Sequence, residues 1–192
     1  MTTSKTAPKP RSQRADARRN HDKVLTTARA QFAEHGLETS MEAIARDAGV
    51  GVGTIYRHFP TKEDLLQALA DDRFEGLAAA ARAALEVEDP WEAFAGFMTH
   101  SAQVMATDRA LSEAMDQLPG LCSSAAARVD MLGHVGAVIA RAQQSGDLRA
   151  DVVAEDVPAL ICGLGSAIRS EVERPTMSWE RYLEIILAGL RA

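Results

Sequence analysis

The chain has 192 residues, of which 46% are apolar and 25% are charged. This length suits one large or two small globular domains. The apolar content excludes disorder over most of the chain. The two cysteines, Cys122 and Cys162, lie far apart, which excludes a disulfide framework, and no apolar stretch is long enough to span a bilayer. The basic, polar N-terminus has no apolar segment of a secretory signal, so we expect a soluble, cytoplasmic protein.

Charge is divided unevenly along the chain. Residues 1–62 contain eleven Lys and Arg and six Asp and Glu, a net charge of +5, whereas residues 63–192 carry −11, which leaves −6 for the whole chain. A basic front third joined to an acidic body indicates a module that binds a polyanion. Within it, we interpret residues 1–17 as a flexible basic arm that either follows DNA or only keeps the chain in solution.

Apolar residues recur at helical spacing along almost the whole chain, and almost no segment alternates as a strand does. Four helices are expected in the front half, at 22–35, 39–48, 54–59 and 61–85. Five more are expected behind them, at 90–107, 108–118, 122–144, 151–171 and 178–190. The predicted N-caps are Thr39, Thr61, Asp89 and Ser178. The predicted fold class is therefore all-α, with about nine helices.

The segment 39–62 has the pattern of a helix-turn-helix. This motif needs a small residue where its two helices cross, a turn residue that reaches positive φ, and an apolar residue that faces back into the core. Ala45, Gly49 and Ile55 have these properties at suitable spacing. Capping signals stand on both sides of the segment, a helix precedes it and its local charge is basic, so the pattern indicates a DNA-binding module.

Residues 24–66, with the run AIARDAGVGVGTIYRHFPTKEDLL, resemble the DNA-binding domain of the TetR family of bacterial transcriptional regulators. The resemblance implies a recognition helix near 52–57 in the major groove, a long linking helix, and a helical body that dimerises and often binds a small effector. The implied domains are a DNA-binding domain at 18–77, with its motif at 40–59, and an effector-binding and dimerisation domain at 78–192. Gly51 stands where many members carry Ser, so one phosphate-contacting hydroxyl is missing.

The exposed side of the motif supplies the predicted DNA contacts. They are Thr39, Ser40, Gly53, Thr54, Tyr56, Arg57, His58 and Lys62. The first two are expected to present hydroxyls and helix-terminal N–H groups to phosphate. Thr54 and Arg57 are expected at base edges, because Arg to guanine is the commonest specific contact. Tyr56, His58 and Lys62 are expected at the DNA backbone.

The body contains an apolar set that predicts either a ligand pocket or ordinary core packing. The residues are Phe94, Phe97, Met98, Ser101, Met105, Gln117, Met131 and His134. Large apolar surface with few polar groups is the usual composition of a small-molecule site, and Met side chains adapt to its shape. No cationic cluster occurs between residues 91 and 139, so the expected effector is mostly apolar.

The last two long helices are the expected dimer interface. The residues proposed there are Leu160, Gly163, Leu164, Ala167, Ile168, Tyr182, Ile185, Ile186 and Gly189. Glycine and alanine permit close approach of helices, and the larger side chains bury apolar area. Paired operator half-sites require such a two-fold dimer.

Other chemistry is not indicated. The glycines at 49, 51 and 53 do not form a dinucleotide-binding loop, and no cysteine or histidine has metal-ligand spacing, so neither a cofactor nor a metal is expected. With no catalytic constellation, the chain is not expected to be an enzyme. The expected function is a homodimeric repressor that a small effector releases from palindromic double-stranded DNA, without a membrane partner. The alternatives are an all-helical enzyme or interaction module with a structural helix-turn-helix, and a regulator without an effector.

Overall fold

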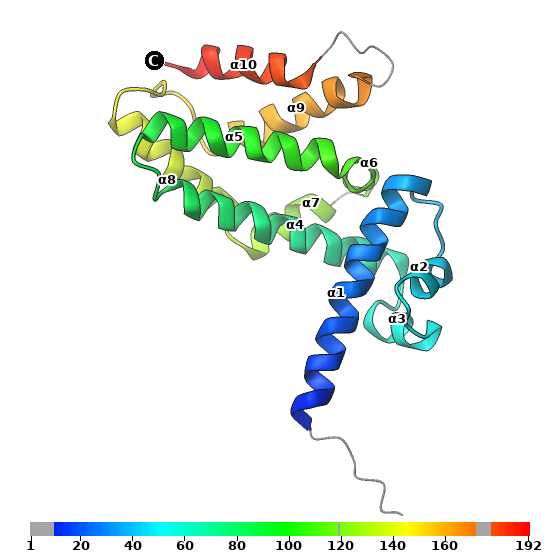
Figure 1. The fold of residues 1–192 in the computed structure, drawn as a ribbon. Coiled ribbons are helices and arrows are strands. Elements are labelled where there is room, and N and C mark those ends of the chain that lie inside the picture. The colour runs from blue at the N-terminus through cyan, green and yellow to red at the C-terminus, as the bar shows by residue number, and fades with distance from the viewer. Residues whose placement is uncertain (1–9, 119, 172–177) are drawn as a thin grey trace, which may run out of the picture. The chain divides into compact units, whose positions relative to one another are not determined.

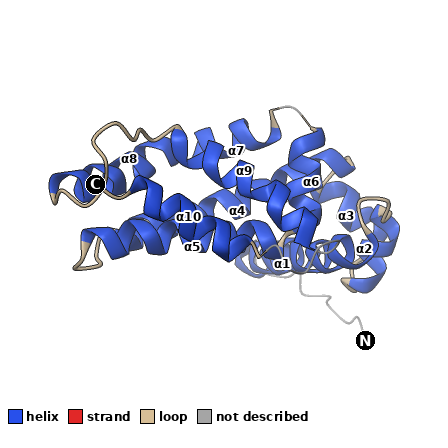
Figure 2. Ribbon diagram, turned by 90° about the horizontal axis from the view of Figure 1, so that it is seen from above, coloured by secondary structure: helices blue, strands red, loops and turns tan. Residues whose placement is uncertain are grey.

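The computed structural model describes residues 10–118, 120–171 and 178–192, and within these ranges it contains ten α-helices and one isolated β-bridge (Figures 1 and 2). The helices are α1 (Pro10–His35), α2 (Met41–Asp47), α3 (Val52–His58), α4 (Lys62–Ala84), α5 (Pro90–Thr107), α6 (Arg109–Gln117), α7 (Leu121–Arg128), α8 (Met131–Gln144), α9 (Asp156–Glu171) and α10 (Trp179–Leu190). The predicted all-α class is confirmed. No helix among the described residues is long and apolar enough to cross a membrane.

The chain divides into two compact units, Met1–Ala68 and Leu69–Ala192. The boundary falls inside α4, earlier than the predicted boundary after residue 77. At the other end of the first unit, α1 begins at Pro10. Residues 10–17 are therefore helical where a flexible arm was expected, while the rest of the predicted arm, residues 1–9, lies outside the described residues.

The first unit is a three-helix domain completed by the first turns of α4. Its core side chains recur at helical spacing and come from all four segments. Those with at most 5% exposure are Val24, Leu25, Ala28, Phe32, Met41, Ile44, Ala45, Ile55, Phe59, Leu65 and Leu66. Isolated helices as short as α2 and α3 are only marginally stable in water, so each depends on burying its apolar face against the neighbouring helices of the unit.

The second unit is built around α5, which packs against α8, α9 and α10 (Figure 1). The predicted Asp89 N-cap is confirmed, because its Oδ1 accepts hydrogen bonds from the N–H groups of Trp91 at 2.8 Å and Glu92 at 3.0 Å. At the chain end, the N–H of Ala192 donates to the carbonyl of Asp147 at 2.9 Å. That bond ties the end of α10 to the loop after α8.

Two predicted helices differ from those observed. The helix expected at 122–144 is broken into α7 and α8 at Asp130, whose φ of 48° is left-handed and incompatible with a continuous helix. A Cβ at Gly133 would meet the carboxylate of the Asp130 side chain, which would have to move aside. The helix expected from 151 begins at Asp156, and the carboxylate of Asp156 accepts a hydrogen bond from the N–H of Val153 at 2.9 Å.

Candidate functional site

The turn between α2 and α3 has the geometry that a helix-turn-helix requires. Gly49 adopts a φ of 66°, its N–H donates to the carbonyl of Arg46 at 3.1 Å, and the N–H of Val50 donates to that of Ala45 at 2.9 Å. This pair of bonds ends a helix with a left-handed glycine and satisfies its last carbonyls. Ala45 and Ile55 are fully buried, so the three roles predicted for Ala45, Gly49 and Ile55 are observed.

Helix α3 turns one side into the core and leaves the other accessible. Ile55 faces inward with no exposed surface, whereas Gly53, Tyr56 and Arg57 are exposed. Thr54 and His58, also predicted DNA contacts, are half-buried. The five predicted residues of α3 therefore all retain solvent-accessible surface on one short helix, as recognition of a DNA groove requires.

The N-cap of α2 differs from the predicted one. Ser40, not Thr39, is the N-cap, and its exposed Oγ accepts a hydrogen bond from the N–H of Ala43 at 3.2 Å. Thr39 is 8% exposed, and its hydroxyl donates to the carbonyl of Gly36 at 3.1 Å. The Thr39 hydroxyl thus closes the α1–α2 turn, and Ser40 is the residue that presents a hydroxyl to solvent there.

A hydrogen bond connects the exposed side of α3 to the first turn of α2. The Tyr56 hydroxyl donates to Oε1 of Glu42 at 2.7 Å, with both side chains on the surface. This bond lowers the pKa of Glu42 below its ordinary value and raises that of Tyr56, because it favours the ionised carboxylate and the protonated phenol. The pair holds the Tyr56 hydroxyl in one position on the surface expected to meet DNA.

The other end of α3 rests on aromatic rings. The ring of His21, on α1, lies 6.1 Å from that of His58 in an edge-on arrangement and 5.2 Å from that of Phe59. Because Phe59 is buried, these contacts hold His58 at the edge of the core. Arg57, between Tyr56 and His58 in the sequence, remains exposed in the last turn.

Lys62, a predicted contact to the DNA backbone, packs against the three-helix unit. Its side chain is half-buried, its ammonium donates to the carbonyl of Leu37, and Nζ lies 5.8 Å from the centre of the Phe32 ring. A cation over an aromatic face and bonded to a carbonyl is already well coordinated. These contacts fasten the start of α4 to α1 and to the turn after it, and the phosphate contact of Lys62 stays a prediction.

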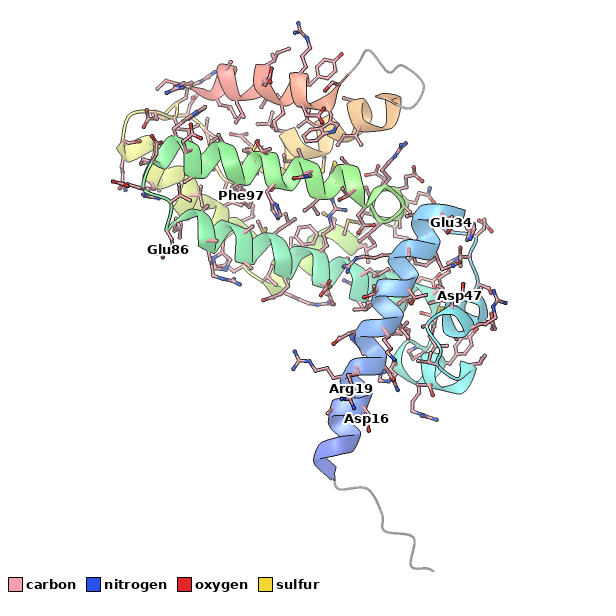
Figure 3. The ribbon with its side chains drawn as sticks, in the orientation of Figure 1. Asp16, Arg19, Glu34, Asp47, Glu86 and Phe97 are labelled. Carbon is pink, nitrogen blue, oxygen red and sulfur yellow. The ribbon has the colours of Figure 1, made fainter. Side chains whose placement is uncertain are left out.

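Helix α1 adds exposed charge to the first unit. Arg18, Arg19 and Lys23 are exposed, and Arg19 forms an ion pair with Asp16 on the preceding turn (Figure 3). Farther along α1, Nε2 of Gln31 donates to the carboxylate of Asp47 at 2.7 Å and so links α1 to the end of α2.

The second unit contains a cavity of about 190 Å³. Its lining residues come from α4 to α9 and are Arg73, Phe74, Leu77, Phe97, Ser101, Met105, Ser112, Met115, Asp116, Cys122, Ala126, Met131, Val135, Val157, Pro158, Ile161 and Cys162. Figure 3 shows Phe97 on the side of α5 that faces α4. Of the predicted pocket residues, Phe97, Ser101, Met105 and Met131 line this cavity.

The other four predicted pocket residues lie elsewhere. Phe94 and Met98 have no exposed surface and belong to the core cluster. Gln117 is exposed at the end of α6. His134 is half-buried, with Nε2 at 3.2 Å from Nη1 of Arg82. Phe94 and Met98 were misplaced because apolar periodicity identifies a buried face without distinguishing core from cavity wall.

Arg73 lines the cavity and was not among the residues predicted from the sequence. It is only 8% exposed, and its Nη1 donates to the hydroxyl of Ser112 at 2.9 Å and lies 3.8 Å from the sulfur of Met115. A signal existed, because Arg73 stands at a core position of α4 between Ala70 and Leu77. Nearby, burial raises the pKa of the Cys122 thiol.

The residues predicted for the dimer interface divide by burial. Leu164 and Ile168 are 3% and 4% exposed within the single chain, so they pack inside its own unit. Leu160, Ala167, Tyr182 and Ile186 are half-buried, and Gly163 and Gly189 are exposed. Ile185 is 56% exposed on α10, which makes it the large apolar side chain of this set most available to a partner.

Metal chemistry is not indicated by the arrangement of side chains. Among the residues described by the structure, no three His, Cys, Asp or Glu side chains gather where they could hold an ion.

Comparisons with known proteins agree with this architecture. Residues 24–69 match the model of the bacterial regulatory proteins of the tetR family, and residues 89–192 match that of the C-terminal domain of SbtR-like transcriptional regulators. A TetR transcription regulatory protein from Mycobacterium vanbaalenii is 38% identical, with a TM-score of 0.69 over 94% of this chain and 99% of that chain. A TetR transcriptional regulator from Streptomyces coelicolor is 28% identical, with a TM-score of 0.65 over 89% of this chain and 98% of that chain.

Similarity to curated proteins covers a short part of the chain. An HTH-type transcriptional regulator of Staphylococcus aureus is 45% identical over 53 residues, which are 27% of this chain and 29% of that protein. The match to such relatives therefore spans less than a third of their length.

Replacing Tyr56 by phenylalanine tests the contact between α2 and α3. Tyr56→Phe removes the donated hydrogen bond, so the pKa of Glu42 should rise toward its ordinary value in an NMR titration of its carboxyl carbon. Because the folded-state pKa is lowered, this bond stabilises the unit above the ordinary pKa of Glu, and the contribution is lost as pH falls through the lowered pKa. Tyr182→Phe, at the other tyrosine, is the control and should leave the Glu42 titration unchanged. An identical Glu42 titration in both variants would show that the bond does not form.

Proposed function

The chain belongs to the TetR family of bacterial regulatory proteins, and we propose that it acts as a homodimeric repressor that a small molecule releases from a near-palindromic DNA operator. As a member of this family it is a helix-turn-helix transcriptional regulator. The observation that carries the proposal is α3, which is anchored by buried Ile55 and exposes Tyr56 and Arg57 beyond a left-handed glycine turn. That the chain has no catalytic activity stays a prediction.

The proposed DNA contacts are the accessible residues of the motif. Ser40 donates its hydroxyl to phosphate, Tyr56 and His58 contact the DNA backbone, and Thr54 and Arg57 reach base edges. Gly53 supports this assignment, because no described atom outside its own helix and its two chain neighbours lies within 4 Å of the position that a Cβ would take there. The fold itself thus does not require glycine at 53, whereas a closely approaching DNA backbone would.

The proposed effector site is the cavity of the second unit. Its apolar lining with few polar groups is typical of a small-molecule pocket. Helix α4 carries Lys62 in its first turn and Arg73, Phe74 and Leu77 in the cavity wall. A ligand that binds two arrangements of α4 with different affinity would shift the DNA-binding equilibrium, and one with equal affinity for both would not.

The proposed dimer forms through α9 and α10. The exposed Ile185 side chain and the exposed glycines 163 and 189 support this, since they offer apolar surface and room for close approach. A two-fold dimer would bring two copies of α3 to two half-sites about one helical turn of DNA apart.

Arg57 should set preference among DNA sites. Arg57→Ala is expected to lower operator affinity and to weaken discrimination at one base pair per half-site by about 1–3 kcal/mol, since a bidentate contact to guanine is lost. Fluorescence anisotropy against a series of single-base operator variants measures this. Arg181→Ala removes the same charge from α10 and serves as the control, with affinity and discrimination unchanged. Equal discrimination by Arg57→Ala and the wild-type chain would rule out base contact by Arg57.

Ile185 should be needed for assembly. Ile185→Asp places a charge on exposed apolar surface of α10, so the chain is expected to elute as a monomer in size-exclusion chromatography with light scattering, while its helical circular dichroism is retained. Leu132→Asp changes an apolar residue of α8 that is 45% exposed and should leave the dimer intact. A wild-type chain that is monomeric at micromolar concentration, or a dimeric Ile185→Asp variant, would refute this interface.

A further inference from the structure

The cavity of the second unit offers a ligand few hydrogen-bonding groups. Most of its wall is hydrocarbon, aromatic ring or sulfur. The two serine hydroxyls of the wall already donate within the chain. Ser101 donates to the carbonyl of Phe97 at 2.8 Å. Ser112 donates to the carbonyl of Asp108 at 3.0 Å and accepts a hydrogen bond from Arg73 at 2.9 Å. A ligand with several polar groups would therefore leave most of them without partners, which is costly.

The volume limits the size of a ligand. An apolar cavity of about 150 Å³ inside a protein binds benzene. At about 190 Å³, the present cavity has room for one six-membered ring with a small substituent, and a polycyclic compound would require the walls to move.

The lining favours an aromatic ring. Phe74 and Phe97 offer ring faces and edges. Met105, Met115 and Met131 offer three thioether sulfurs. Offset and edge-on ring contacts and sulfur–aromatic contacts are each favourable beyond simple burial. A saturated ring of the same size would gain only the burial.

The ionisable groups of the wall favour an uncharged ligand. Among the described lining residues, Arg73 contributes a positive charge and Asp116 a negative one, so the two charges sum to zero. Both side chains also take part in interactions within the chain beyond the bond from Arg73 to Ser112. Burial raises the pKa of the Cys122 thiol, which is therefore neutral and adds no charge. A charged ligand would leave water for a wall that has no net charge to compensate it.

From these observations we infer that the effector is an uncharged compound with a single aromatic ring and at most one small polar substituent, bound with its ring among the Phe and Met side chains of this cavity. This inference rests on the proposed function, because it names the ligand class of the same pocket. It narrows the mostly apolar effector expected from the sequence by size, by ring type and by charge.

Calorimetric titration with four probes of nearly equal size tests the inference on the full chain without DNA. Benzyl alcohol should bind most tightly. Benzoate and benzylamine, which are ionised at neutral pH, should bind about tenfold or more weakly, because each brings a charge into the cavity. Cyclohexylmethanol should bind about threefold or more weakly, although its saturated ring is the more hydrophobic, because it lacks the ring and sulfur contacts.

The aromatic wall is tested by two matched variants of α5. Phe97 and Phe94 are both buried on this helix, but only Phe97 lines the cavity. Phe97→Leu should reduce the preference for benzyl alcohol over cyclohexylmethanol, and Phe94→Leu should keep the wild-type preference. An undiminished preference in Phe97→Leu would contradict the proposed place of the ring.

A second pair of variants keeps the test decisive if Phe97→Leu does not fold. Ala126→Leu fills part of the cavity and should weaken benzyl alcohol binding, whereas Ala127→Leu, at an exposed alanine of α7 outside the lining, should not. The inference is overturned if wild-type protein binds no probe, if it binds benzoate, benzylamine or cyclohexylmethanol as tightly as benzyl alcohol, or if Ala126→Leu leaves benzyl alcohol binding unchanged.

Duplex DNA binding by the same ligand-free samples separates this inference from the proposed function. DNA binding without selectivity for benzyl alcohol overturns the ligand class alone. No DNA binding by wild-type protein overturns the proposed function.

Discussion

Helices α2 and α3 can cross closely only because Ala45 offers a small side chain at the crossing and Gly49 adopts a left-handed backbone between them. A Cβ at position 49 would meet no atom within 4 Å, so the requirement for glycine there is conformational rather than steric, at about 1–2 kcal/mol. With the turn in place, Ile55 is buried and Tyr56 and Arg57 face outward. The orientation of every proposed base contact depends on this one turn.

Helix α4 combines two kinds of constraint along its length. At its start, Lys62 binds the carbonyl of Leu37 and covers the Phe32 ring, which ties the helix to the three-helix unit. Farther along, Arg73 occupies a position that the apolar repeat would give to a hydrophobic residue. A buried guanidinium is a costly choice for a core unless it is bonded. Its bond to Ser112 meets part of this need, and its side chain forms part of the cavity wall.

Local signals in the sequence were sufficient for the helix-turn-helix and insufficient for the pocket. The glycine turn and the Asp89 cap depend on neighbours in the chain, so their patterns predicted them correctly. The predicted N-cap of α2, Thr39, is one residue before the observed one, Ser40. Both residues carry a hydroxyl, and sequence signals do not locate a helix end to a single residue. Phe94 and Phe97 have the same apolar character, yet only Phe97 lines the cavity, because that difference arises from how α5 packs against other helices. Arg73 was detectable as a charge at a core position.

The salt dependence of DNA binding tests the central claim most directly, that the α2–α3 unit binds duplex DNA. A duplex enriched by the protein from a random pool should bind with an affinity that falls steeply as salt rises, with a slope of log K against log salt of about −0.9 for each phosphate neutralised. For the wild-type chain we expect log K to fall by several units for each tenfold rise in salt concentration. Failure to enrich any duplex, or an affinity that stays constant from low to moderate salt, would contradict it.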